Sequence, residues 1–133
     1  MPVDVKYSTR ATAKGGRDGS ARSEDGRVDV KLSTPKELGG ARGAGTNPEQ
    51  LFAAGYSACF IGAMKVAGGQ LKIRVPDDTT VTATVGIGPR SEGGFCITAA
   101  LSVSLPGINR EQAQKLVETA PDLPLLQRNP QQP

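Results

Sequence analysis

The residue of this chain with the clearest chemical potential is Cys59, which lies within a run of small and apolar side chains from Pro48 to Ala67. A free cysteine in such a run is most often a packed and inert core residue. The same thiol becomes a nucleophile when a neighbouring cation or a helix dipole stabilises its thiolate form. The run by itself leaves both interpretations open.

Two charged residues are candidates to act with Cys59. The chain contains no histidine, so a stabilising cation has to be an arginine or a lysine. Arg17, in a glycine-rich loop after the first predicted strand, is a candidate by residue type but not by spacing, and its simpler role is a solvated loop charge. Glu49 precedes Cys59 by ten residues, about three helical turns, so the two lie roughly on one side of a helix. Its simpler role is a first-turn acid that favours the helix dipole.

The second cysteine, Cys96, follows Gly93 and Gly94 at the start of a predicted strand. No motif surrounds it, so we interpret it as a small apolar residue of a sheet. With two cysteines and no histidine, the chain lacks the usual base of serine and cysteine hydrolases and has too few good ligands for zinc. We therefore predict no metal site.

Composition excludes several classes of partner. The 133 residues fit one domain, and a net charge of +3 comes from 16 scattered lysines and arginines. The absence of a basic cluster with interleaved aromatics argues against nucleic-acid binding. Met1 to Arg10 is polar and alternating, unlike a signal peptide, and no apolar run approaches membrane-spanning length once Lys65 and the neighbouring glycines are counted. Free thiols suit a reducing compartment, so we predict a cytoplasmic protein without a membrane partner.

Local patterns predict three strands, a helix, two strands and a last helix. The first strand pattern begins at Val3 and runs to Lys14, and Asp25-Gly26 predicts a hairpin between the next two. Asn47 can cap the central helix, Pro48 suits its first position, and the pair Gly68-Gly69 ends it. We expect this helix to be covered on most of its circumference. The other predicted ranges are 20–24, 27–32, 79–88 and 95–105 for strands, and 109–120 for the last helix.

This order predicts an α+β fold in a single domain spanning residues 1–120. After Ala120 the sequence changes character, because residues 121–133 are rich in proline and show no periodicity. We expect these residues to form a loose, disordered tail.

Several segments together resemble the organic hydroperoxide resistance (Ohr) branch of the OsmC/Ohr family. The longest is residues 46–60, TNPEQLFAAGYSACF, and it is joined by residues 16–19, GRDG, and residues 32–40, LSTPKELGG. Residues 85–88 and 105–107 match as well. The likeness extends from about Tyr7 to Ala120, and the helix motif is long and specific.

The resemblance implies a thiol peroxidase in which Cys59 is the peroxidatic cysteine. Arg17 would stabilise its thiolate, and Glu49 would orient that arginine through a salt bridge. The resemblance also implies antiparallel sheets around a long central helix, and an intertwined homodimer with the two central helices packed in its middle. The implied substrates are organic hydroperoxides, and the implied reductants are dihydrolipoyl groups on lipoylated proteins. No bound cofactor is implied.

The chain departs from the family after its last helix. The family carries a resolving cysteine in a segment reading Ala-His-x-x-Cys-Pro-Tyr-Ser-x-Ala-x-Arg, which residues 121–133 do not match, and Cys96 lies elsewhere. Synonymous codons exist for this tail that, read one base later, give Gln-Ile-Cys-Pro-Tyr-Ser-Asn-Ala-Thr-Arg-Asn. We therefore hypothesise a frameshift near the codon of Ala120. The nucleotide sequence of the gene tests it, since codons incompatible with that encoding would exclude it.

The sequence supports two alternative functions. The first is a cysteine-based organic hydroperoxide reductase whose turnover is impaired by the missing resolving cysteine. The second is a non-catalytic OsmC-like protein that binds an apolar ligand or partner. The presence of Arg17, Glu49 and Cys59 together favours the first, and the absent resolving cysteine favours the second.

Overall fold

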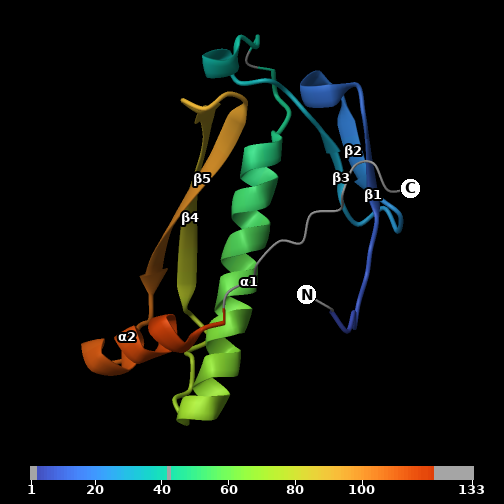
Figure 1. Cartoon of the computed structure of the whole chain (residues 1–133). Coiled ribbons are helices and arrows are strands. Elements are labelled where there is room, and N and C mark those ends of the chain that lie inside the picture. Colours follow the sequence, from blue (N-terminus) through green and yellow to red (C-terminus); the bar gives the residue numbers. More distant parts are fainter. Residues whose placement is uncertain (1–2, 42, 122–133) are drawn as a thin grey trace. The chain divides into compact units, whose positions relative to one another are not determined.

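The computed structural model describes residues 3–41 and 43–121. Its elements follow the predicted order, and the arrangement is α+β with two sheets, β1-β2-β3 and β4-β5 (Figure 1). The predicted loose tail, residues 121–133, lies outside the described residues apart from Pro121. The elements are β1 (Ala11–Lys14), β2 (Ser20–Ser23), β3 (Asp29–Lys31), α1 (Pro48–Leu71), β4 (Thr80–Pro89), β5 (Phe95–Ser104) and α2 (Arg110–Thr119), with 3-10 turns at Gly16–Asp18 and Lys36–Leu38.

The chain divides into two compact units. The first comprises Met1–Phe52 with Val85–Ile97, and the second comprises Ala53–Thr84 with Thr98–Pro133. Both α1 and the β4-β5 hairpin therefore contribute to each unit. The single domain expected for residues 1–120 stays a prediction.

The first unit contains the antiparallel three-stranded sheet β1-β2-β3, drawn in blue in Figure 1. In its register Thr12 faces Arg22 on β2, and Ala21 faces Val30 on β3. The predicted Asp25-Gly26 hairpin is confirmed, since β2 and β3 pair antiparallel on either side of it. Within the turn the Asp25 carboxylate accepts from the Arg27 backbone N–H at 3.0 Å. The first strand begins at Ala11 rather than Val3, because the residues that pair with β2 are only those from Ala11 to Lys14. An alternating pattern of residues does not by itself provide a neighbouring strand with which to form hydrogen bonds.

The second unit is built around a small apolar core. Four residues are buried together: Met64 and Ala67 of α1, Leu116 of α2, and Val75 from the segment between α1 and β4. Partly buried apolar side chains pack against them, among them Ile61, Val81, Val103 and Leu105. Figure 1 shows α2 crossing the C-terminal half of α1, which agrees with this contact. Helix α2 begins as predicted, because the Asn109 side chain accepts from the Gln112 backbone N–H at 2.8 Å.

Helix α1 begins where the sequence predicts and ends later. The Asn47 side chain accepts from the Gln50 backbone N–H at 2.9 Å, which confirms the cap. The predicted stop at Gly68-Gly69 is wrong, since the helix continues to Leu71. The Ile73 N–H donates to the Gly68 carbonyl at 3.0 Å, with Lys72 at a φ of 58°. This is the bond that closes a Schellman C-cap, with lysine in the left-handed position that glycine usually takes.

The expected coverage of α1 is also corrected. Within the described chain its buried residues are Ala63, Met64, Ala67 and Gly68, whereas Val66 is 56 % exposed. Cys59, expected inside a covered helix, is exposed. Among the described residues, the buried residues of α1 lie in its C-terminal half, and Met64 and Ala67 belong to the core of the second unit.

The length of α1 corrects a further expectation. At 24 residues this helix is long and apolar enough to cross a membrane by length and composition, against the expectation that no run approaches that length. The core helix of a soluble protein passes the same test. Its buried residues Met64 and Ala67 belong to the core of the second unit.

Candidate functional site

The first unit brings together two of the residues that the sequence singled out. Arg17 donates from Nη1 to Glu49 Oε1 at 2.8 Å and from Nη2 to Glu49 Oε2 at 2.9 Å. This two-pronged geometry matches the planar guanidinium to the carboxylate and is stronger than a single contact. The side chains of Arg17 and Glu49 are 33 % and 14 % exposed, so the pair is partly shielded from solvent and still reachable.

Arg17 is placed by a tight turn after β1. Gly15 and Gly16 adopt φ values of 78° and 68°, which favour glycine over residues with a Cβ. A Cβ at Gly19 would clash with the carbonyl oxygen of Lys14, so the turn folds directly back on the strand it leaves. The glycine-rich segment therefore has a structural purpose, since it projects Arg17 from a compact turn.

Glu49 is placed by the start of α1. Leu32, which continues from β3, forms a parallel bridge with Thr46, and the Ser33 N–H donates to the Thr46 carbonyl at 2.8 Å. Asn47 then caps the helix, and Glu49 follows in the first turn. The three-stranded sheet thus carries both members of the pair, Arg17 from its β1-β2 connection and Glu49 through the β3-α1 connection.

The ion pair perturbs both of its members. The hydrogen bonds from Arg17 hold the pKa of the Glu49 carboxyl below its ordinary value of 4.5, against a smaller opposing effect of burial. The hydrogen bond to Glu49 likewise raises the pKa of Arg17 above its ordinary value. Both groups are therefore charged at neutral pH. A fixed, charged guanidinium is what thiolate stabilisation requires.

Cys59 belongs to the second unit and lies on α1, ten residues beyond Glu49. Its exposure makes the thiol accessible to a small substrate. The placement of Cys59 against Arg17 stays a prediction. Cys96, interpreted as a small apolar residue of a sheet, lies in β5 and is exposed, with its Sγ 3.6 Å from the Ile97 carbonyl oxygen.

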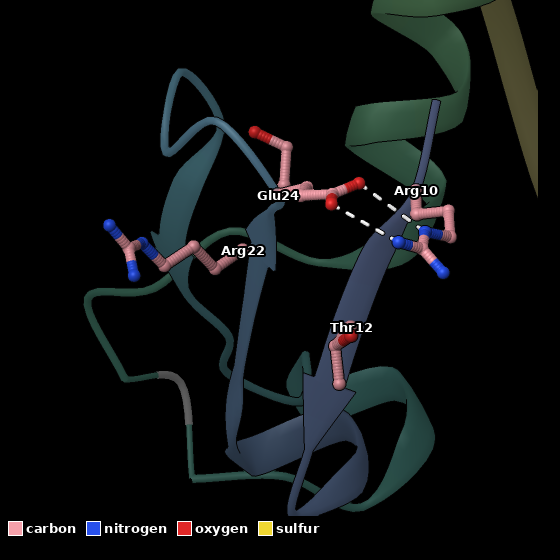
Figure 2. Close-up of a pocket in the computed structure, with 5 residues that line it drawn as sticks. Arg10, Thr12, Arg22 and Glu24 are labelled. Atoms are coloured by element: carbon pink, nitrogen blue, oxygen red, sulfur yellow. Dashed lines mark hydrogen bonds and ion pairs between the residues drawn. The ribbon is translucent and has the colours of Figure 1, made fainter. Parts of the chain in front are cut away.

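A second feature of the first unit is a concavity of about 370 Å³ on the face of β1 and β2. Figure 2 shows the side chains of Arg10 and Glu24 pointing toward each other and that of Arg22 extending away from them. Arg10 pairs with Glu24 at 3.1 Å and Arg22 with Asp29 at 3.7 Å, so both cations already have counter-ions. Within the described ranges no group of three or more histidine, cysteine, aspartate or glutamate residues is placed to hold a metal ion.

Sequence reasoning did not find Asp18, whose Oδ1 accepts a hydrogen bond from the Thr34 backbone N–H at 2.9 Å. Its position inside residues 16–19, beside Arg17, was the available signal. Spacing also gave no reason to pair Arg17 with Glu49, because 32 residues separate them.

Comparison with known proteins agrees with this architecture. The family model described as "OsmC-like protein" matches residues 39–123. An organic hydroperoxide resistance protein of Xanthomonas axonopodis pv. citri is 53 % identical over 119 residues, which cover 90 % of this chain and 83 % of the relative.

Solved structures give the same result. One is described as an organic hydroperoxide resistance protein OsmC from Legionella pneumophila. It superposes with a TM-score of 0.80 and 41 % identity, covering 88 % of this chain and 84 % of that one. The organic hydroperoxide resistance protein OhrB of Bacillus subtilis superposes with a TM-score of 0.76 and 39 % identity, covering 87 % and 84 %. The chain therefore belongs to the OsmC-like family, and within it to the organic hydroperoxide resistance branch.

Proposed function

We propose that this protein is a thiol-dependent peroxidase that reduces organic hydroperoxides to alcohols and so defends the cell against oxidative stress. The observation that carries the proposal is the two-pronged Arg17–Glu49 ion pair at the start of the helix that bears Cys59. Membership in a family whose relatives are named for organic hydroperoxide resistance supports it.

Each of the three residues has one role in the proposed chemistry. The Cys59 thiolate attacks the distal oxygen of the hydroperoxide, the O–O bond breaks, and the thiolate becomes a sulfenic acid. The leaving alkoxide takes a proton and departs as the alcohol. Arg17 stabilises the thiolate and the negative charge that develops on the departing oxygen. Glu49 fixes the plane of the guanidinium, so that less reorganisation is needed when the substrate arrives.

A dithiol completes the proposed cycle. One thiol of a dihydrolipoyl group condenses with the Cys59 sulfenic acid, which releases water and forms a mixed disulfide. The second thiol then displaces Cys59, which regenerates its thiol and leaves the oxidised lipoyl disulfide. The reductant is thus the external partner, carried on lipoylated proteins, and no cofactor is bound. We place this chemistry in the cytoplasm, where such dithiols stay reduced.

We further propose that the protein works as an intertwined homodimer. The support is the apolar surface that one copy of α1 leaves exposed, at Leu51, Phe52 and Val66. Large apolar side chains exposed on a helix are more stable when a partner covers them. A second copy of α1 has the matching surface.

Intact mass spectrometry of the reduced protein, before and after one equivalent of an organic hydroperoxide, tests the proposal. We expect one oxygen atom to be added in the wild type and in Cys96→Ser, and none in Cys59→Ser. Loss of two hydrogens from the wild type but not from Cys96→Ser would show a disulfide between the two cysteines instead. An unchanged wild-type mass under conditions in which the hydroperoxide is stable would contradict the proposal.

The alternative, a non-catalytic protein that binds an apolar ligand or partner, is favoured by one observation. Cys59 and Cys96 are the chain's two cysteines, and neither lies in the family's resolving segment. Turnover with a dithiol distinguishes the two functions. A peroxidase consumes many equivalents of hydroperoxide when a dihydrolipoyl compound is present, whereas the alternative consumes at most one.

A further inference from the structure

We propose that Asp18 is a positioning residue for the Arg17–Glu49 pair. By accepting the Thr34 backbone N–H, its carboxylate fixes the turn that carries Arg17 to the connection that leads into α1. The effect on catalysis rests on the proposed function, whereas the effect on the ion pair does not. Asp18 itself touches neither substrate nor the reacting sulfur in this proposal.

The acceptor is well placed for this purpose. The Thr34 N–H donates to Asp18 Oδ1 at 2.9 Å in a partly buried setting, and Thr34 is 8 % exposed. A backbone N–H that is shielded from water needs a partner, and a carboxylate is the strongest one available. The bond therefore has a defined length and little competition from solvent.

Thr34 is itself held in place. A Cβ at Gly40 would clash with the carbonyl oxygen of Thr34, so the loop after the Lys36–Leu38 turn packs directly on it. The preceding residue, Ser33, donates its N–H to the Thr46 carbonyl at 2.8 Å. Asp18 thus binds a segment whose preceding residue is hydrogen-bonded to Thr46, two residues before α1 begins.

The hydrogen bonds form a short path between the two members of the pair. Arg17 is adjacent to Asp18, Asp18 binds Thr34, and Ser33 binds Thr46, three residues before Glu49. Two parallel bonds at 2.8 and 2.9 Å tolerate little displacement of either side chain. Without Asp18, the turn keeps its bonds from Gly19 N–H to the Gly16 carbonyl and from Leu32 N–H to the Gly19 carbonyl. We therefore expect a variant to fold with a loosened Arg17.

Three substitutions distinguish the positioning role of Asp18 from the effect of its charge and from a general loosening of the sheet. Asp18→Ala removes the acceptor, whereas Asp18→Asn removes the charge and keeps an oxygen that accepts the Thr34 N–H. Asp25→Ala is the matched control, because Asp25 also accepts a backbone N–H, from Arg27 at 3.0 Å, in the same sheet and at the opposite end of β2 from the Arg17 turn.

The first readout is the carboxyl titration of Glu49 by carbon NMR, which requires no activity. We expect the pKa of Glu49 to rise toward its ordinary value in Asp18→Ala, and to stay near the wild-type value in Asp18→Asn and Asp25→Ala. Equal changes in Asp18→Ala and Asp18→Asn would mean that only the charge of Asp18 matters. An unchanged Glu49 in Asp18→Ala would mean that the pair does not need it. Either result overturns the proposal.

The second readout is the rate of Cys59 oxidation by cumene hydroperoxide in a single turnover. We expect Asp18→Ala to be about tenfold slower than wild type, and Asp18→Asn to stay within about twofold, since a misplaced catalytic cation costs rate steeply. In an Arg17→Ala background the Asp18→Ala substitution should have no further effect. An equal loss in that background would contradict action through Arg17. If the wild type itself does not react, the proposed function fails, and the titration still decides the role of Asp18.

Discussion

Arg17 and Glu49 are 32 residues apart in the sequence and are joined by two parallel hydrogen bonds of 2.8 and 2.9 Å. One comes from a turn between strands and the other from the first turn of a helix. Such a pair fixes the orientation of the guanidinium as well as its charge.

Substitution of Arg17 separates the contribution of its positive charge from the contribution of its fixed orientation. Arg17→Ala removes both, and we expect the rate of Cys59 oxidation by an organic hydroperoxide to fall about a hundredfold, the usual cost of losing one electrostatic stabiliser. Arg17→Lys keeps a charge but cannot form the two-pronged contact, so we expect an intermediate loss of about tenfold. Stopped-flow measurement under single-turnover conditions gives both rates. Equal rates for the lysine variant and the wild type would show that orientation is unimportant.

Glu49 gives the protein a predictable dependence on pH. Its pKa in the folded protein lies below the ordinary value of 4.5, so its stabilising effect is complete above that value and is lost as the pH falls through the folded pKa. We expect the wild type to exceed Glu49→Gln by about 1 kcal/mol in free energy of unfolding at pH 7. The difference should vanish in acid.

Urea unfolding of both proteins between pH 7 and pH 3 measures this difference. Asp25 also has a lowered pKa, through its hydrogen bonds from Arg27 and Ser23, but it is present in both proteins and cancels. A difference that stays constant across the whole range would contradict the assignment to Glu49.

Two adjacent glycines of α1 should respond in opposite ways to alanine. A Cβ at Gly68 would clash with the Ile73 carbonyl oxygen, whereas nothing lies within 4 Å of a Cβ at Gly69. We expect Gly68→Ala to destabilise the protein by about 1–3 kcal/mol through overpacking. Gly69→Ala should stabilise it by about 0.5–1 kcal/mol, because alanine loses less backbone entropy in a helix. Thermal unfolding of both variants checks this, and changes of the same sign would contradict the close packing at Gly68.

The proposed homodimer predicts a specific sensitivity on α1. Val66 is 56 % exposed in one copy, so Val66→Glu removes little from the core of that copy. If a second copy covers this surface, the buried carboxylate should weaken the dimer at least tenfold. Light scattering after size exclusion measures the oligomeric state. Gln112→Glu places the same carboxylate at an exposed position of α2 and should leave the oligomeric state unchanged. A monomeric wild type would contradict the proposal directly.

Elements that depend on neighbouring residues were predictable from local sequence patterns. The cap at Asn47, the first helical position at Pro48 and the hairpin at Asp25-Gly26 were all predictable, because each rests on bonds within a few residues. The order of strands and helices followed from the same local patterns. The residues 46–60 also identified the family from sequence alone, since their types are specific.

Features that depend on residues distant in the chain became visible only in the folded protein. Helix α1 was predicted to end at Gly68-Gly69 and ends at Leu71, because the chain folds back there and the Ile73 N–H donates to the Gly68 carbonyl. The two glycines alone do not show where the chain folds back onto the helix. The first strand shortened to start at Ala11 because a ladder needs a paired neighbour.

The pairing of Arg17 with Glu49 belongs to the same class. The sequence shows that both residues are present, but a β1-β2 turn and the start of α1 come together only through the sheet and the bridge from Leu32 to Thr46. Residue type is local information, whereas the direction of a charged side chain is fixed by the packing of segments far apart in the chain. For that physical reason residue spacing named Arg17 and Glu49 only as separate candidates. The family resemblance implied their salt bridge, and the folded chain shows the two hydrogen bonds that form it.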